Sequence, residues 1–200
     1  MRLIIYDKTD KNFVGWTWVV GSWLYSLFNR VDARYGAISW ADALDWVIRI
    51  SENKEITEIQ FWGHGSWGGA VINGDWLTSW WAQREPLNSR LLTVRNRLAK
   101  DFVWWFRTCN SFGAHKGMEF AKTFSNLIRR TVAAHTFIIW KFHSGLRVIR
   151  PTEEPSWPAE EGIKEGTPEK PEEALWSHPK APHSIFFTTT TIPEKILKKE

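Results

Sequence analysis

Ile56–Asp75 reads I-T-E-I-Q-F-W-G-H-G-S-W-G-G-A-V-I-N-G-D. The apolar run Ile59–Trp62 predicts a buried strand that ends at Gly63-His64-Gly65. A histidine between two glycines has little side-chain bulk beside it, and its backbone can adopt unusual dihedral angles. Ala70–Ile72 followed by Asn-Gly predicts a small hairpin beyond that loop. We therefore expect a strand that delivers His64 to a loop at one edge of a sheet.

A second apolar strand, Phe102–Phe106, leads through Arg-Thr into Cys109, the single cysteine of the chain. One cysteine cannot form an internal disulfide, so nothing indicates a disulfide-stapled scaffold. A thiol attacks as the thiolate and needs a base nearby. His64, 45 residues earlier, can take that proton and later protonate the leaving group. The backbone N–H groups of Gly65 and Cys109 can then face the oxyanion.

The rest of the chain predicts strands that alternate with helices. Strands are expected at 3–6, within 31–38, at 132–139 and at 146–149, and helices at 14–29, after Ser39, after Pro86 and at 115–130. This alternation indicates an α/β domain with a mostly parallel sheet flanked by helices on both faces. Ligands of such sheets bind outside the carboxyl ends of the strands, so His64 and Cys109 can meet if their strands are neighbours.

The composition changes after Arg150, which suggests three parts. Residues 1–150 form the predicted α/β domain. Residues 151–173 are rich in Pro and Glu and predict a disordered linker. Residues 174–200 form a C-terminal tail, in which Ser184–Ile192 is β-prone and can dock as an edge strand.

Overall composition excludes several classes of function. Apolar residues make up 43% and charged residues 24%, an ordinary globular balance, and 15 Trp predict bulky core packing or an aromatic-lined groove. The net charge of +4 is scattered, so no nucleic-acid partner is expected. The uncharged, Trp-rich Phe13–Phe28 is too short to span a bilayer, so a buried helix is expected, with no membrane partner and a cytoplasmic location.

The two strand-end motifs resemble those of the caspase-like cysteine peptidases and the related CHAT domains. The histidine motif is F-W-G-H-G-S and the cysteine motif is V-W-W-F-R-T-C-N-S. The family places its histidine about 50 residues before its cysteine. Over residues 1–149 the resemblance implies a caspase-like three-layer sandwich and a cysteine endopeptidase acting through an acyl-enzyme. His64 is then the base, Cys109 the nucleophile, and Gly65 with Cys109 the oxyanion hole.

The resemblance also implies substrate contacts. Family members often read the P1 side chain from the end of the first strand, where Asp7 lies and would favour a basic residue; Asn110 and Ser111 flank the nucleophile. The substrate would be a peptide or a protein, and no cofactor is implied. The flanks of Cys109 differ from the Q-A-C-x-G of caspases, so no specificity for Asp follows.

Other interpretations stay open. Relatives that have lost activity act as protein-binding modules, and His64 and Cys109 can be purely structural. His64-Gly-Ser-Trp-Gly-Gly with Ser111 resembles a serine esterase, although G-x-S-x-G is incomplete. The glycine-rich loop lacks a phosphate-binding signature, and His64, Cys109 and His115 lack the spacing of zinc ligands, so no metal site is predicted. The substrate and the oligomeric state do not follow from the sequence.

Overall fold

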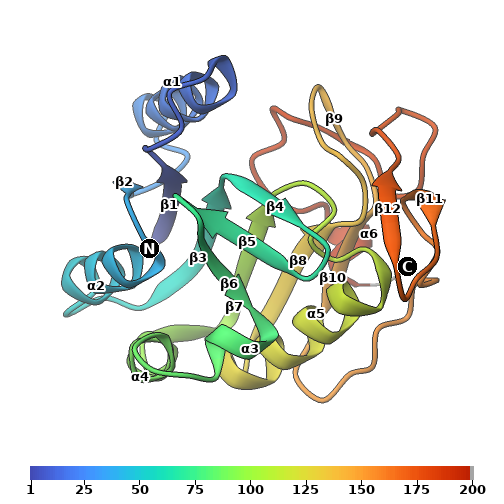
Figure 1. Ribbon diagram of the computed structural model, residues 1–200. Coiled ribbons are helices and arrows are strands. Elements are labelled where there is room, and N and C mark those ends of the chain that lie inside the picture. The colour runs from blue at the N-terminus through green and yellow to red at the C-terminus, as the bar shows by residue number, and fades with distance from the viewer. Residues whose placement is uncertain (199–200) are drawn as a thin grey trace.

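The computed structural model describes residues 1–198, and its centre is a six-stranded sheet (Figure 1). Across the sheet the strands follow the order β10 (Leu146–Ile149), β8 (Thr131–His135), β7 (Leu98–Arg107), β3 (Ile56–Trp62), β1 (Arg2–Asp7) and β2 (Ala33–Ala37). All neighbours pair in parallel except β10, which is antiparallel to β8. The predicted α/β class with a mostly parallel sheet is confirmed.

Three helices cover one face of this sheet and form the main core with it. They are α2 (Trp40–Ile50), α4 (Leu87–Arg95) and α5 (Ala114–Ile128). Along β7, the alternate residues Phe102, Trp104 and Phe106 all belong to this core and are fully buried. The aromatic residues predicted as bulky core packing therefore fill the space between the sheet and these helices.

Helix α2 begins as its sequence predicts. The Oγ of Ser39 accepts a hydrogen bond from the Asp42 N–H at 3.1 Å. The carboxylate of Asp42 in turn accepts from the N–H of Ile38 at 3.1 Å. The indole of Trp40 then donates to the carbonyl of Ala70 at 3.1 Å, which attaches the start of the helix to the hairpin beyond β3.

The connection between β3 and β7 contains more secondary structure than the predicted loop, hairpin and helix. It forms a three-stranded antiparallel sheet of β4 (His64–Ser66), β5 (Gly69–Ile72) and β6 (Asp75–Thr78), followed by α3 (Ser79–Ala82) and α4. The predicted hairpin at Asn73-Gly74 joins β5 to β6. Asn73 and Gly74 both adopt positive φ there, which suits these two residue types.

Two different segments cover the other face of the sheet. Helix α1 (Phe13–Leu27) packs Trp18 and Tyr25 against Ile4 and Trp62. The C-terminal segment covers β7, β8 and β10; Ile185, Ile192 and Ile196 are buried there in one cluster with Trp105 and Val148. Ile196 belongs to the short helix α6 (Glu194–Leu197).

The prediction of a buried helix at residues 13–28 is wrong for one side of α1. Only Gly15 and Ser22 of this helix are buried, and a Cβ at Gly21 would lie 2.8 Å from the ring of Trp62, which explains the close approach to the sheet. Six large apolar side chains on the outer side of the helix are exposed, as is that of the C-cap residue Phe28. Among residues 1–198, none of the helices has the length and apolar character that crossing a membrane requires.

The prediction of a disordered linker at residues 151–173 is also wrong. This stretch contains β11 (Ile163–Gly166) and the start of its antiparallel partner β12 (Pro171–Ala174). Trp157 is buried and stacks on Phe112 at 5.6 Å between ring centroids, while its indole donates to the Phe112 carbonyl at 3.1 Å. Glu161 pairs with Arg147 and accepts a hydrogen bond from Thr136 Oγ1 at 2.7 Å. These anchors hold a chain whose composition alone suggests disorder.

The predicted edge strand within Ser184–Ile192 forms, but elsewhere than on the central sheet. β13 (Ile185–Phe186) pairs antiparallel with the two-residue strand β9 (Phe142–His143). The following residues cross the sheet face, and the carbonyl of Thr190 accepts hydrogen bonds from Arg2 and Gln60. Residues 199–200 of the predicted tail lie outside the described residues.

Candidate active site

The strands that precede His64 and Cys109 are neighbours. β3 and β7 pair in parallel, and Trp62 at the end of one strand is in register with Arg107 at the end of the other. His64 and Cys109 each follow two residues later, so both leave the sheet at its carboxyl edge, where parallel sheets bind ligands. This part of the sequence-based geometry is confirmed.

The histidine hairpin packs directly on the cysteine loop. A Cβ added to Gly65 would lie 2.7 Å from the Cβ of Thr108, so only glycine permits this approach of the two backbones. The N–H of Gly68 donates to the carbonyl of Ser111 at 3.1 Å. Gly65 and Cys109, the two predicted oxyanion donors, thus belong to segments in contact.

His64 pairs with a carboxylate that the sequence analysis did not assign to the site. Its Nε2 lies 2.9 Å from Oδ2 of Asp10, and the edge of the Trp18 ring packs against the imidazole at 5.0 Å between centroids. The imidazole is half exposed, whereas the side chain of Asp10 is only 7% exposed. A carboxylate only accepts, so this contact holds the proton on Nε2 and leaves Nδ1 as the basic nitrogen.

The charge of Asp10 is favoured by its hydrogen bonds. Burial acts to raise its pKa, but the N–H of Asn12, which donates to Oδ1 at 2.8 Å, and the contact with His64 outweigh it and lower the pKa. Asp10 therefore stays ionised and can stabilise a protonated imidazole. The signal available in the sequence was its place just after β1, the strand beside β3, whose following loop opens at the same edge.

Cys109 is partly buried and has no hydrogen bond to His64 within residues 1–198. Its Sγ lies 4.0 Å from the carbonyl of Ile139. Burial raises the pKa of the thiol, and the backbone at Ile139 offsets only part of this effect. In the same described range the backbone N–H of Cys109 has no hydrogen-bond acceptor, as an oxyanion donor requires.

The two residues after Cys109 shape the loop. Asn110 is buried with φ near +30°, and its N–H donates to the carbonyl of Phe137 at 2.9 Å. Ser111 is fully buried, and its Oγ shares a hydrogen bond with Oγ1 of Thr108 at 2.7 Å. Their side chains, predicted to contact substrate, are thus enclosed in the loop.

Asp7, the predicted reader of a basic P1 side chain, is buried and already bonded. Its Oδ1 accepts from the N–H and the hydroxyl of Thr9 at 2.8 and 2.6 Å, and its Oδ2 accepts from the N–H of Asn73 at 3.3 Å. Asp7 thus connects the end of β1 to the turn between β5 and β6. The structure brings it to the same edge of the sheet as His64.

Arg107, two residues before the thiol, is a buried cation held by the C-terminal segment. Its guanidinium lies between the rings of Trp62 and Trp105, with centroid distances of 4.8 and 4.5 Å. It donates to the carbonyls of Phe187 and of Thr189, the latter at 3.1 Å. Burial, the dominant influence, lowers its pKa. The C-terminal segment is therefore fastened to the strand that carries the candidate nucleophile.

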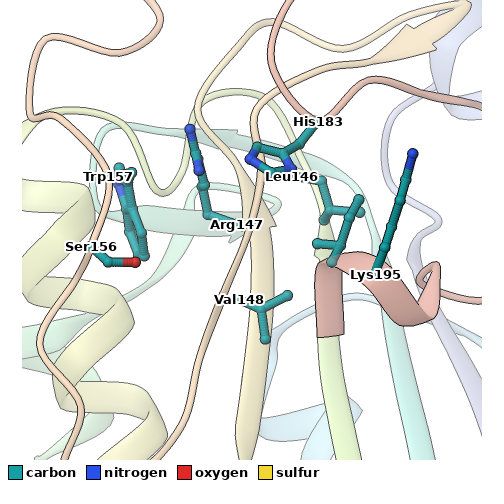
Figure 2. Close-up of a pocket in the computed structure, with 8 residues that line it drawn as sticks. Leu146, Arg147, Val148, Ser156, Trp157, His183 and Lys195 are labelled. Carbon is teal, nitrogen blue, oxygen red and sulfur yellow. The ribbon is translucent and has the colours of Figure 1, made fainter. Parts of the chain in front are cut away.

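A separate pocket is formed by other residues. Figure 2 shows it between β10, Trp157 and α6, with Arg147, His183 and Lys195 among its lining residues. Arg147 there is paired with Glu161. Neither His64 nor Cys109 lines the pocket, so it gives no support to the dyad.

Within residues 1–198, no three His, Cys, Asp or Glu side chains gather closely enough to hold a metal ion. His64, Cys109 and His115 accordingly do not form a cluster, and His115 contacts Glu169 instead, at 3.2 Å. No protein-family model matches this chain, and no curated protein matches it either.

Proposed function

We propose that this protein is a caspase-like cysteine endopeptidase that uses His64 and Cys109 through an acyl-enzyme. The observation that carries the proposal is the placement of both residues just beyond the carboxyl ends of adjacent parallel strands, with the Asp10 carboxylate bonded to Nε2 of His64. Base, nucleophile and positioning carboxylate are the parts that acyl transfer requires.

The reaction steps follow from the assignment of the His64 proton to Nε2, which leaves Nδ1 free to act as the base. Nδ1 of His64 takes the proton of Sγ, and the thiolate of Cys109 attacks the peptide carbonyl to form a tetrahedral intermediate. The free N–H of Cys109, joined by that of Gly65, donates to the oxyanion. His64 then gives its proton to the departing amine, and a thioester remains on Cys109. Water, deprotonated by His64, hydrolyses the thioester and restores the thiol.

Asp10 acts as a positioning residue in this scheme. Its lowered pKa keeps it ionised, so it compensates the imidazolium that forms when His64 takes the proton. The resting thiol is protonated because burial raises its pKa. Proton transfer to His64 therefore belongs to the substrate complex, where hydrogen bonds that are long in the free enzyme shorten.

The second candidate is a catalytically inactive domain of the same type that binds a protein partner. It is favoured by the partial burial of Cys109, which raises the pKa of the thiol, and by the lack of a hydrogen bond between His64 and Cys109 in the described chain. In that case the strand-end loops and the exposed tryptophans bind a partner without cleaving it.

A fluorogenic peptide library separates the two candidates. The wild-type chain should cleave a subset of peptides, and Cys109→Ala or His64→Ala should each lower kcat/KM at least about 1000-fold. Asp10→Asn should lower it about 10- to 100-fold, since the imidazolium that forms on His64 loses its carboxylate partner.

Two controls complete the design. Ser111→Ala should still cleave the peptides, because the Ser111 hydroxyl is buried and bonded to Thr108. If Ser111→Ala were inactive while Cys109→Ala remained active, the nucleophile would be a serine instead. Glu169→Gln removes the charge that pairs with the exposed His115 and should leave kcat/KM unchanged. Peptides that bind without being cut, in wild type and variants alike, would overturn the peptidase and support the binding module.

A further inference from the structure

The outer side of α1 is an apolar surface that the rest of the described chain leaves uncovered. We call it the α1 face, and it consists of Phe13, Trp16, Val19, Trp23, Leu24, Leu27 and Phe28. Each of these side chains is between 37% and 66% exposed. The face extends about 22 Å along the helix. An exposed apolar patch of this length marks an interaction surface.

The α1 face continues onto a neighbouring loop. The ring of Trp140 lies 6.4 Å from that of Phe13 and is 54% exposed. Trp140 precedes β9, so the surface combines two segments far apart in the sequence. Tryptophan is the residue that prefers the boundary between water and hydrocarbon, and Trp16, Trp23 and Trp140 all lie on this surface.

Charges around the α1 face are mainly positive. Helix α1 itself carries none, whereas four exposed basic residues flank the surface in sequence: Lys8 and Lys11 before the helix, Arg30 after it, and Lys141 next to Trp140. Asp32 is the exposed acid nearest in sequence, and Asp10 is engaged by His64. Lys11 immediately precedes the N-cap residue of α1. The helix dipole favours an acidic residue at this end, so the charge of Lys11 does not stabilise the helix.

These observations select one occupant. We propose that the α1 face docks on the surface of an anionic lipid bilayer, with α1 parallel to the membrane plane and its apolar side chains in the interfacial region. An exposed apolar helix face binds a bilayer surface through the apolar area it buries, and basic residues beside it add contacts to anionic headgroups. A second copy packed antiparallel would bring Lys11 close to the partner copy's Arg30, and these like charges would repel each other.

Vesicle cosedimentation tests the proposal with the full chain. The wild type should pellet with vesicles of phosphatidylcholine and phosphatidylglycerol in equal parts, and much less with phosphatidylcholine alone. Trp23→Ser with Leu27→Ser should weaken binding at least about tenfold. Lys11→Gln and Arg30→Gln should each weaken binding to the anionic vesicles about fivefold, because a cation near such a surface contributes about 1 kcal/mol.

Matched controls use other exposed residues. Trp80→Ser with Trp81→Ser removes two exposed tryptophans on α3, and Lys54→Gln removes a cation on the turn after α2; both should bind like wild type. The proposal is overturned if wild type binds neither vesicle or if the α1 and α3 pairs weaken binding equally. It is also overturned if sedimentation velocity shows a dimer that the α1 variant dissociates while vesicles leave the protein in solution. None of these outcomes depends on peptide cleavage.

Discussion

Helix α1 and the C-terminal segment 151–198 are attached to the rest of the molecule in different ways. Ile185, Ile192 and Ile196 of the segment lie on the sheet face that α1 covers, whereas Trp157 packs into the main core on the opposite face. α1 has no charged residue, yet only two of its residues are buried and a row of large apolar side chains faces outward. The C-terminal segment is rich in Pro, Glu and Lys, yet it buries Trp157, Ile185, Ile192 and Ile196. Attachment therefore depends on a few side chains with matching sites on the sheet, and mean hydropathy is a poor guide to it.

Removing the main anchor of the C-terminal segment should have the largest effect on stability. Trp157→Ala loses the stack on Phe112 and the hydrogen bond to its carbonyl, and should lower the free energy of unfolding by about 3–5 kcal/mol. Trp176→Ala makes the same change at a 63% exposed site of that segment, and it should alter the free energy of unfolding by no more than about 0.5 kcal/mol. Urea unfolding measures both, and equal losses would contradict the anchor model.

Acid should weaken the C-terminal side of the molecule next. His135 is fully buried; it donates from Nδ1 to the Ser144 carbonyl at 3.1 Å and accepts from the indole of Trp105 at 3.3 Å. Burial lowers its pKa to about 3. The native state thus resists protonation that the unfolded chain accepts near pH 6.5, so stability present above pH 6.5 falls as pH drops toward 3, by about 1.4 kcal/mol per pH unit.

Denaturation curves between pH 7 and about pH 5 check this slope. The ring centroid of His143 lies 5.2 Å from that of His135. Burial lowers the pKa of His143 as well, so His143 also makes the native state less stable as the pH falls. His135→Asn should flatten the profile, whereas His115→Asn at an exposed site should leave its shape unchanged. A wild-type profile without slope in this range would show that His135 is protonated in the native state.

A smaller effect is expected where α1 begins. Asp10→Asn weakens the contact with His64 and should cost about 1 kcal/mol at neutral pH. Because the native pKa of Asp10 is lowered, its contribution is present above the ordinary value of 3.8 and disappears as pH falls through the native value. The difference between wild type and variant should close in acid, and a difference independent of pH would exclude a role for the carboxylate charge.

The smallest effect is expected on the outer side of α1. Trp23→Ser removes a large side chain that is 50% exposed, so the free energy of unfolding should change by no more than about 0.5 kcal/mol. Differential scanning calorimetry at two protein concentrations checks this value. A loss above about 1.5 kcal/mol that grows with concentration would mean that α1 is covered by self-association.

Much of the fold could be predicted because the local sequence patterns match the strands and helices that the tertiary structure contains. Continuous apolar runs predicted β1, β3 and β7, and Ser39 with Asp42 predicted the start of α2. The candidate dyad followed from two strands that end in unusual residues. Asp10 was missed because its role depends on the loop after β1 folding back beside His64, a contact across 54 residues that no local pattern reports.

The errors have a common cause. Composition described residues 151–173 as unable to bury a core, but one tryptophan and one buried glutamate, matched by Phe112 and Arg147, were enough to fix the chain. The uncharged composition of residues 13–28 likewise predicted a buried helix. The helix contacts the sheet on the side that carries Gly21 and Ser22, where Gly21 allows close approach to Trp62 and Ser22 accepts a hydrogen bond from Arg34.

The sequence by itself determined the alternation of strands and helices, the exit of His64 and Cys109 from two strands, and the absence of an internal disulfide. These properties depend on short-range periodicity and on residue type. Tertiary structure alone decided that the two strands are neighbours, that Asp10 holds His64, that the thiol is partly buried, and that α1 keeps an apolar face exposed. Each of these depends on which distant surfaces fit together, and that fit is a property of the packed chain.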